Sequence, residues 1–215
     1  MNYIVDKESG ILKAENLCFN SKCVEVPRED KFRGLYSHIL IKIDLENAIT
    51  YLERAIVEDD YSIKDGLFRI AVISYAKCFS ASKRGGRSPL NAEKIYKGNK
   101  EDIYHHKCFV EMRNKYFAHD EKDFKDAMVG LLLNVDSREY VEIIDVALRG
   151  EFAFEATLKI LRVLCEKNLD EVEIMIKNDK EGLRAYFDEK NFCDLEKYPE
   201  INLKMEPVKM DISSD

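Results

Sequence analysis

The residues of this sequence that are best suited to chemistry lie in one short run, RNKYFAHD, at positions 113–120. His119 titrates near neutral pH and can transfer protons. Arg113 is always charged and can donate two hydrogen bonds to phosphate oxygens, and Asn114 can orient a phosphate or the histidine. Attack of an RNA 2′-hydroxyl on the adjacent phosphorus needs these functions, because protons must move and the charge of the phosphorane must be stabilised.

The same residues also fit an ordinary helix end. Positions six apart on an α-helix are separated by about 120° around the axis, so Arg113 and His119 share a face only if the helix ends after Phe117. The stem of Arg113 can cover apolar neighbours, and His119 suits the negative end of a helix dipole. Asp120 either tunes the histidine or ends the helix. The residues alone leave both interpretations open.

The run resembles the motif of the HEPN superfamily, in which an Arg-Asn pair and a later histidine are separated by four residues. Arg113, Asn114 and His119 stand at the matching positions, with an alanine before the histidine. The preceding stretch RIAVISYAKCF, followed by a basic glycine loop, is similar to the helix before the motif in some members. The resemblance covers roughly residues 35–185.

This resemblance implies a helical bundle that acts as a metal-independent endoribonuclease, as in toxin–antitoxin, phage-defence and CRISPR-associated systems. It implies a homodimer whose two motifs form one composite cleft, with RNA as the substrate and an antitoxin protein as a further partner. Arg113 would stabilise the phosphate, His119 would transfer protons and Asn114 would orient. Some members are non-catalytic, so an RNA- or nucleotide-binding or adaptor protein is the alternative. A purely structural oligomer is a third reading.

Further candidates for substrate binding are Lys83, Arg84, Arg87, Lys115 and Tyr116. The first three surround a glycine pair, where a backbone can approach a phosphate, although a solvated loop is the more frequent explanation of such a segment. Aromatic residues at helical spacing can stack on bases but more often belong to a core. The adjacent His105 and His106 point in different directions on a helix, and we expect both at the surface.

The amino-acid composition favours some classes of protein and binding site and disfavours others. The chain has 215 residues, of which 46% are hydrophobic and 35% charged, and this predicts a folded domain. A net charge of −7 argues against broad contact with duplex DNA. Six scattered cysteines without a C-x-x-C pair favour neither a metal nor a cofactor, and indicate mostly buried thiols in a reducing cytosol. The absence of a recognisable signal or membrane-spanning run predicts a cytoplasmic location and no membrane partner.

Nine glycines and four prolines favour long helices. The hydrophobic periodicity predicts a mainly α, up-and-down bundle of about four long helices, with a small β-hairpin before the last. The predicted parts are an N-terminal arm (1–30), a HEPN-like helical domain (31–190) with the hairpin at about 127–147, and a polar, extended tail (191–215). Either arm could wrap a second subunit or an antitoxin.

Local signals set the predicted helix ends. The first helix spans about 32–57, and Asp60 or Ser62 can cap the second, which is predicted to end near Ser82. The third runs from about Asp102 to Ala118. The last follows Gly150 and extends through Leu183.

Overall fold

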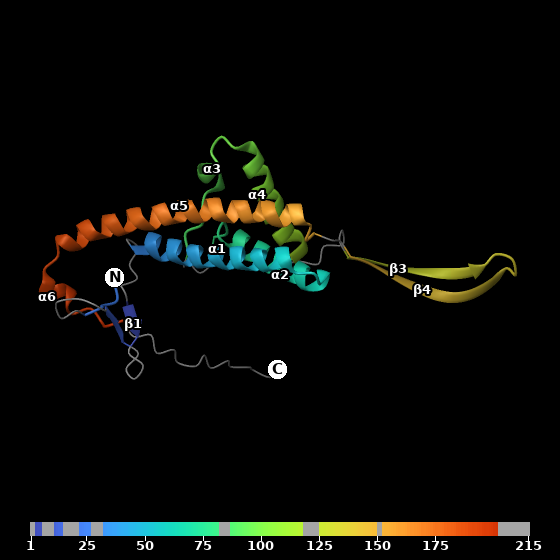
Figure 1. Cartoon of the computed structure of the whole chain (residues 1–215), viewed down its shortest axis with the longest axis horizontal. Helices are drawn as coiled ribbons and strands as arrows, with labels where there is room; N and C mark the ends of the chain where they lie inside the picture. Colours follow the sequence, from blue (N-terminus) through green and yellow to red (C-terminus); the bar gives the residue numbers. More distant parts are fainter. Residues whose placement is uncertain are drawn as a thin grey trace. The chain divides into compact units, whose positions relative to one another are not determined.

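The computed structural model describes residues 3–5, 11–14, 22–26, 32–81, 87–117, 125–149 and 152–201. The chain divides into two compact units, a helical unit of residues Arg33–Lys180 and a terminal unit made of Met1–Phe32 with Glu181–Asp215. In order along the chain (Figure 1), the elements are β1 (Tyr3–Val5), β2 (Leu12–Ala14), α1 (Arg33–Val57), α2 (Tyr61–Lys77), α3 (Ala92–Ile95), α4 (Lys100–Met112), the π-helical turn η2 (Arg113–Phe117), β3 (Lys125–Asn134), β4 (Glu139–Arg149), α5 (Glu155–Asp188) and α6 (Phe192–Leu195). The prediction of a mainly helical protein with a hairpin before its last long helix is confirmed.

Side-chain caps fix the starts of α2 and α4, among other helices. The carboxylate of Asp60 accepts hydrogen bonds from the backbone N–H groups of Ser62 and Ile63, so the predicted cap of α2 is confirmed. Asn99 caps α4 in the same way through the N–H of Asp102. The predicted end of α2 near Ser82 was wrong, since the helix ends at Lys77.

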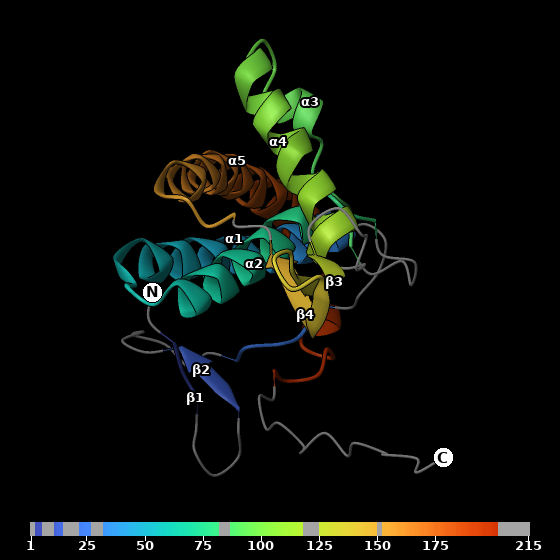
Figure 2. The ribbon, with the colours of Figure 1, turned by 90° about the vertical axis from the view of Figure 1, so that its right-hand side faces the viewer.

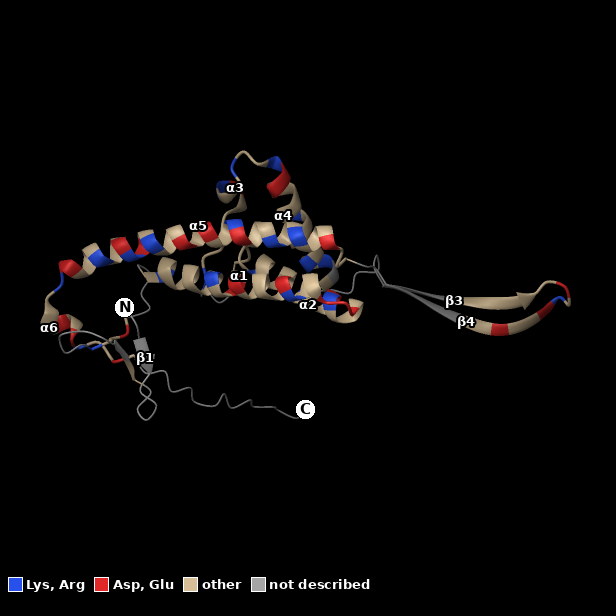
Figure 3. Cartoon of the chain, in the orientation of Figure 1, with Lys and Arg blue, Asp and Glu red and all other residues tan. Residues whose placement is uncertain are grey.

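The helical unit is built on three long helices. α1 runs antiparallel to α5, because His38 contacts Asp179 at 2.7 Å near one end and Glu53 contacts Arg162 at 3.1 Å near the other. Figures 1 and 2 show α5 lying along α1 and α2. The core between the helices consists of fully buried side chains that include Ile41, Leu45, Leu52, Phe68, Val72, Leu158, Leu161 and Val172. Positively and negatively charged residues alternate along α5 (Figure 3).

A buried polar network links α2, α4 and α5. The hydroxyl of Tyr75 lies 3.0 Å from that of Tyr96 and 2.9 Å from Nδ1 of His106. The amide of Asn168 donates to the Tyr96 hydroxyl at 2.5 Å and to the carbonyl of Leu164 at 2.6 Å. The prediction of a surface position for His106 was wrong, since its ring is buried between these aromatic residues.

Burial also shifts the pKa values of the titratable side chains in this network. It raises the pKa of Tyr75 far above its usual value and that of Tyr96 to about 12, so both phenols stay neutral. Burial, helped by the neighbouring charge of Lys107, lowers the pKa of His106. The Oδ1 atom of Asn168 is buried without a hydrogen-bond partner, so the network is satisfied only in part.

The hairpin is a single antiparallel ladder that begins at the pair Lys125–Arg149 and closes at the pair Asn134–Glu139. A two-stranded hairpin before the last long helix was predicted, and it spans residues 125–149. Its closed end is shaped by Asn134, whose side-chain oxygen accepts the N–H groups of Asp136 and Ser137. Arg138 completes the turn with φ +58°, in the left-handed region.

The terminal unit brings the two ends of the sequence together. β1 pairs with β2, and Val24 forms an isolated bridge with Glu200. The N–H of Leu12 donates to the carbonyl of Ile201 at 3.0 Å. The part of the predicted extended tail that the structure describes therefore includes the short helix α6 and a bridged segment, while residues 202–215 lie outside the described chain.

The cysteines divide by environment. Among the described thiols, Cys78 and Cys165 are buried, Cys23 and Cys108 are partly buried and Cys193 is exposed. The expectation of mostly buried thiols was therefore wrong for the described part of the chain. Within that part, no helix is long and apolar enough to cross a membrane.

Candidate functional site

The motif residues Arg113 and Asn114 open a π-helical turn at the end of α4. Five residues, Arg113–Phe117, form this turn, and such wider turns are frequent at functional sites. The Nη1 atom of Arg113 donates to the side-chain oxygen of Asn114 at 2.9 Å in an exposed contact. Among the described residues, Asn114 is the hydrogen-bond partner of this guanidinium, whose other N–H groups can donate to further acceptors.

The turn is anchored by aromatic contacts on its inner side. Phe117 meets Phe68 of α2 edge-on at a centroid distance of 6.2 Å, and meets Phe152 at 6.0 Å. Eight residues earlier, the buried Phe109 packs edge-on against the same Phe68 at 6.4 Å. Edge-on aromatic pairs add about 0.5–1.5 kcal/mol beyond their buried area. The apolar stripe of α4 therefore fixes the turn, while the polar residues at its start face outward.

Arg69 of α2 is a site residue that the sequence did not single out. Its guanidinium lies over the ring of Phe117, 4.8 Å from the centroid, and its Nε atom donates to Asp65 at 2.6 Å. The second oxygen of Asp65 is buried without a hydrogen-bond partner. The i, i+4 spacing of Asp65 and Arg69 in the sequence indicates an ion pair on a helix surface. The contact of Arg69 with Phe117 could not be predicted from the sequence, because it depends on the tertiary fold.

The remaining motif positions are described only in part. Lys115 forms an ion pair with Glu111 at 2.6 Å and is half-buried. The backbone of Tyr116 belongs to the π-helical turn, while its side chain is not described. His119, the predicted proton-transfer residue, and Asp120 lie outside the described residues.

The basic loop before α3 is described only at its end. Lys83 and Arg84 lie outside the described residues. The side chain of Arg87 is 11% exposed and forms an ion pair with Asp44, which also contacts Lys77 at 3.1 Å. The carboxylate of Asp44 thus neutralises part of the positive charge that this loop was predicted to offer a phosphate.

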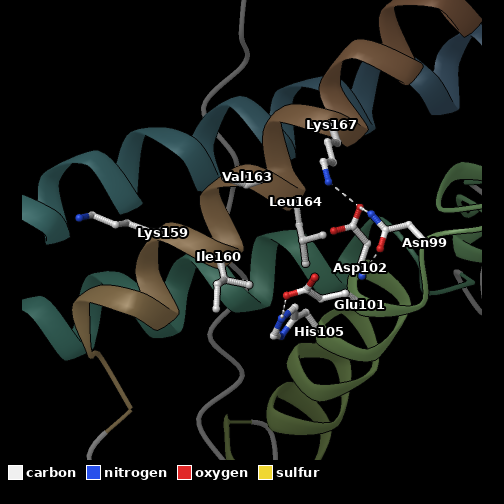
Figure 4. A pocket seen from close by; sticks show the side chains of 9 residues that line it. All are labelled: Asn99, Glu101, Asp102, His105, Lys159, Ile160, Val163, Leu164 and Lys167. Atoms are coloured by element: carbon white, nitrogen blue, oxygen red, sulfur yellow. Dashed lines mark hydrogen bonds and ion pairs between the residues drawn. The ribbon is translucent and has the colours of Figure 1, made fainter.

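A separate pocket of about 330 Å³ lies between the start of α4 and the first half of α5 (Figure 4). Ile160, Val163 and Leu164 supply apolar lining. Its polar lining is internally paired, because Asp102 contacts Lys167 at 2.6 Å and Glu101 contacts His105 at 3.7 Å. The described part of the chain contains no group of three or more His, Cys, Asp or Glu side chains placed to hold a metal ion.

The chain was compared with known protein families, curated proteins and solved structures. No family model matches the chain, and neither the curated proteins nor the solved structures contain a significant match.

Proposed function

We propose that this protein is a metal-independent endoribonuclease of HEPN type, working as a toxin or a phage-defence effector in the cytoplasm. The observation that carries the proposal is the exposed Arg113–Asn114 pair on a π-helical turn, in a sequence that places His119 two residues after the turn. The helices of this unit are compatible with the resemblance, and the hairpin lies outside the fold that the resemblance implies.

The proposed reaction is transfer of the phosphorus from the 5′-oxygen of one nucleotide to the 2′-oxygen of the preceding one. The 2′-hydroxyl loses a proton and attacks, the bond to the 5′-oxygen breaks, and that oxygen takes up a proton. His119 would carry one of these protons. Arg113 would donate to the non-bridging oxygens as negative charge builds up on them. The products are a 2′,3′-cyclic phosphate and a 5′-hydroxyl.

A composite site between two copies would supply a second arginine and histidine. In this proposal Arg113 is held by Asn114 on one side, while Phe117 and Arg69 keep the turn against α2. Lys115 and Tyr116 follow on the same turn and would contact the neighbouring nucleotides.

The test is incubation of the purified full-length protein with total cellular RNA in EDTA. We expect the wild type to cleave RNA and His119→Ala to leave it intact while keeping the helical circular dichroism of the wild type. Equal cleavage by the two proteins would show that His119 is not the catalytic residue.

A non-catalytic RNA-binding or adaptor protein is the second candidate, and the net charge of −7 favours it. Such a protein would bind RNA in a salt-sensitive manner without shortening it. Binding without cleavage by the wild type would therefore select the adaptor over the nuclease.

A further inference from the structure

The hydrogen bonds of the buried network around Tyr96 have a direction, and the side-chain amide of Asn168 fixes it. The amide nitrogen lies 2.6 Å from the carbonyl oxygen of Leu164, and a backbone carbonyl only accepts hydrogen bonds. The atom at that position is therefore the NH₂ nitrogen and not the amide oxygen. The same nitrogen lies 2.5 Å from the Tyr96 hydroxyl, so this hydroxyl accepts a hydrogen bond from Asn168.

The two phenols carry this direction on to the histidine. Among the described residues, the Tyr96 hydroxyl has two side-chain partners, Asn168 and Tyr75. Since it accepts from the first, it donates its own proton to the Tyr75 oxygen, 3.0 Å away. The Tyr75 hydroxyl then donates to Nδ1 of His106 at 2.9 Å. A ring nitrogen that accepts a hydrogen bond carries no proton, so the neutral His106 holds its proton on Nε2.

We infer that this chain of hydrogen bonds is a pH-sensitive switch, in which Asn168 holds His106 as the neutral Nε2–H tautomer and protonation of His106 turns the amide of Asn168 over. A protonated His106 carries a second proton on Nδ1, and this proton faces the proton of the Tyr75 hydroxyl. Both phenols must then reverse, so that Tyr96 donates toward Asn168. The NH₂ group at that position is itself a donor, and the amide must therefore rotate.

Rotation of the amide removes the contact between Asn168 and the backbone of α5. It places Oδ1 where the nitrogen stood, so Oδ1 accepts from Tyr96 but faces the carbonyl oxygen of Leu164 at hydrogen-bond distance. Two acceptors in such contact repel each other. In the neutral state the unsatisfied group is instead Oδ1, which is buried without a partner among the described residues. The charge of His106 thus decides which of two imperfect arrangements is the more stable.

The other charged and titratable groups around the network favour the neutral state. They are Tyr75 on α2, Glu93 on α3, Tyr96 directly after α3, Asp102 and Lys107 on α4, and Cys165 on α5. Burial and the charge of Lys107 lower the pKa of His106, and the opposing effect of Glu93 is smaller. Glu93 pairs with Lys107 at 3.9 Å, and Asp102 pairs with Lys167 at 2.6 Å. Both carboxylates therefore already have a cation beside them.

The experiment is nitrogen NMR of the histidine rings in the isotope-labelled full-length protein, with the His106 signals assigned by their loss in His106→Gln. At pH 7.5 we expect the wild type to show an unprotonated Nδ1 and a protonated Nε2. In Asn168→Asp the carboxyl group has the shape of the amide and can accept from Tyr96, so we expect Nδ1 of His106 to carry a proton. A wild type with its proton on Nδ1, or an Asn168→Asp variant with an unprotonated Nδ1, would overturn the inference.

The same substitution at an exposed position is the matched control. Asn47 is exposed on α1, and Asn47→Asp should leave Nδ1 of His106 unprotonated. If Asn168→Asp loses the helical circular dichroism of the wild type, Tyr75→Phe takes its place. It removes the donor to Nδ1, so we expect His106 to populate both tautomers, and an unchanged Nε2–H tautomer would contradict the chain.

A pH titration of the wild type tests the turning of the amide. The side-chain NH₂ signals of Asn168 should shift together with the ring signals of His106 as the pH falls, while the helical circular dichroism stays constant. Amide signals that do not move while His106 takes up its proton would contradict the switch. None of these outcomes depends on RNA cleavage.

Discussion

At the residue scale, the candidate site depends on how firmly the turn at Arg113–Phe117 is held. The exposed pair Arg113–Asn114 belongs to a backbone segment whose last residue, Phe117, lies between two aromatic rings and a guanidinium. The packing of apolar side chains around Phe117 therefore positions the polar side chains of Arg113 and Asn114. A substitution of a side chain that holds Phe117 can therefore change the position of the residues proposed to bind the substrate.

Arg69 is the clearest example of such a positioning residue. We expect Arg69→Ala to lower the free energy of unfolding by about 1–2 kcal/mol, because the cation–π contact with Phe117 and the pair with Asp65 are both lost. Urea unfolding followed by circular dichroism measures this loss. The control is the exposed Arg54 of α1, whose replacement by alanine should change the free energy by less than about 0.5 kcal/mol. Equal losses in the two variants would contradict the anchoring role.

The thiols offer a second prediction at this scale. Burial raises the pKa of Cys78 to about 12 and that of Cys165 well above its usual range, and a thiol without its thiolate form is unreactive. We expect iodoacetamide at pH 8 to modify Cys193, which is exposed, while the two buried thiols stay unmodified until urea is added. Peptide mass spectrometry measures how much of each cysteine is modified. Modification of Cys78 or Cys165 in the native protein at the rate of Cys193 would contradict the packing described here.

At the element scale, the network around Tyr75 fixes how α4 and α5 pack against α2. Removing the Tyr75 hydroxyl takes one partner from His106 and one from Tyr96. We expect Tyr75→Phe to destabilise the protein by about 1–3 kcal/mol, since buried polar groups are left unpaired. Tyr104, which is 64% exposed on α4, gives the matched control. A loss for Tyr104→Phe as large as that for Tyr75→Phe would show that the network does not stabilise the fold.

The elements also show which features could be predicted from sequence. The cap at Asp60 and the β3–β4 hairpin depend on neighbouring residues, so local rules found them. The burial of His106 depends on Tyr75, which is distant in sequence, and was therefore missed. The bridge between Val24 and Glu200 and the hydrogen bond from the Leu12 N–H to the Ile201 carbonyl join segments that are far apart in the sequence, and no local pattern specifies those pairings. The motif was found by its spacing, while Arg69 was not, because only the fold brings it over Phe117.

At the scale of the whole molecule, the buried His106 predicts that stability depends on pH. Its pKa is lowered by burial and by the charge of Lys107, so below a pH of about 6.5 the unfolded chain binds a proton that the folded chain resists. The stability from this group is fully present above pH 6.5 and is lost as the pH falls toward the lowered pKa. Urea unfolding at pH 7.5 and pH 5.5 should show a loss on acidification that His106→Gln makes smaller. An equal loss in both proteins would contradict this assignment.

The measurement that tests the central claim most directly is end-group analysis of RNA treated in EDTA with the wild type, Arg113→Lys and Arg113→Ala. We expect the wild type to leave 2′,3′-cyclic phosphate and 5′-hydroxyl ends. Arg113→Ala should lower the cleavage rate about 10²–10³-fold, as loss of a donor to a developing oxyanion does, and Arg113→Lys should recover it only in part because lysine lacks the planar fork. Fragments with other ends, or equal rates in all three proteins, would contradict the assignment of RNKYFAHD as a ribonuclease site.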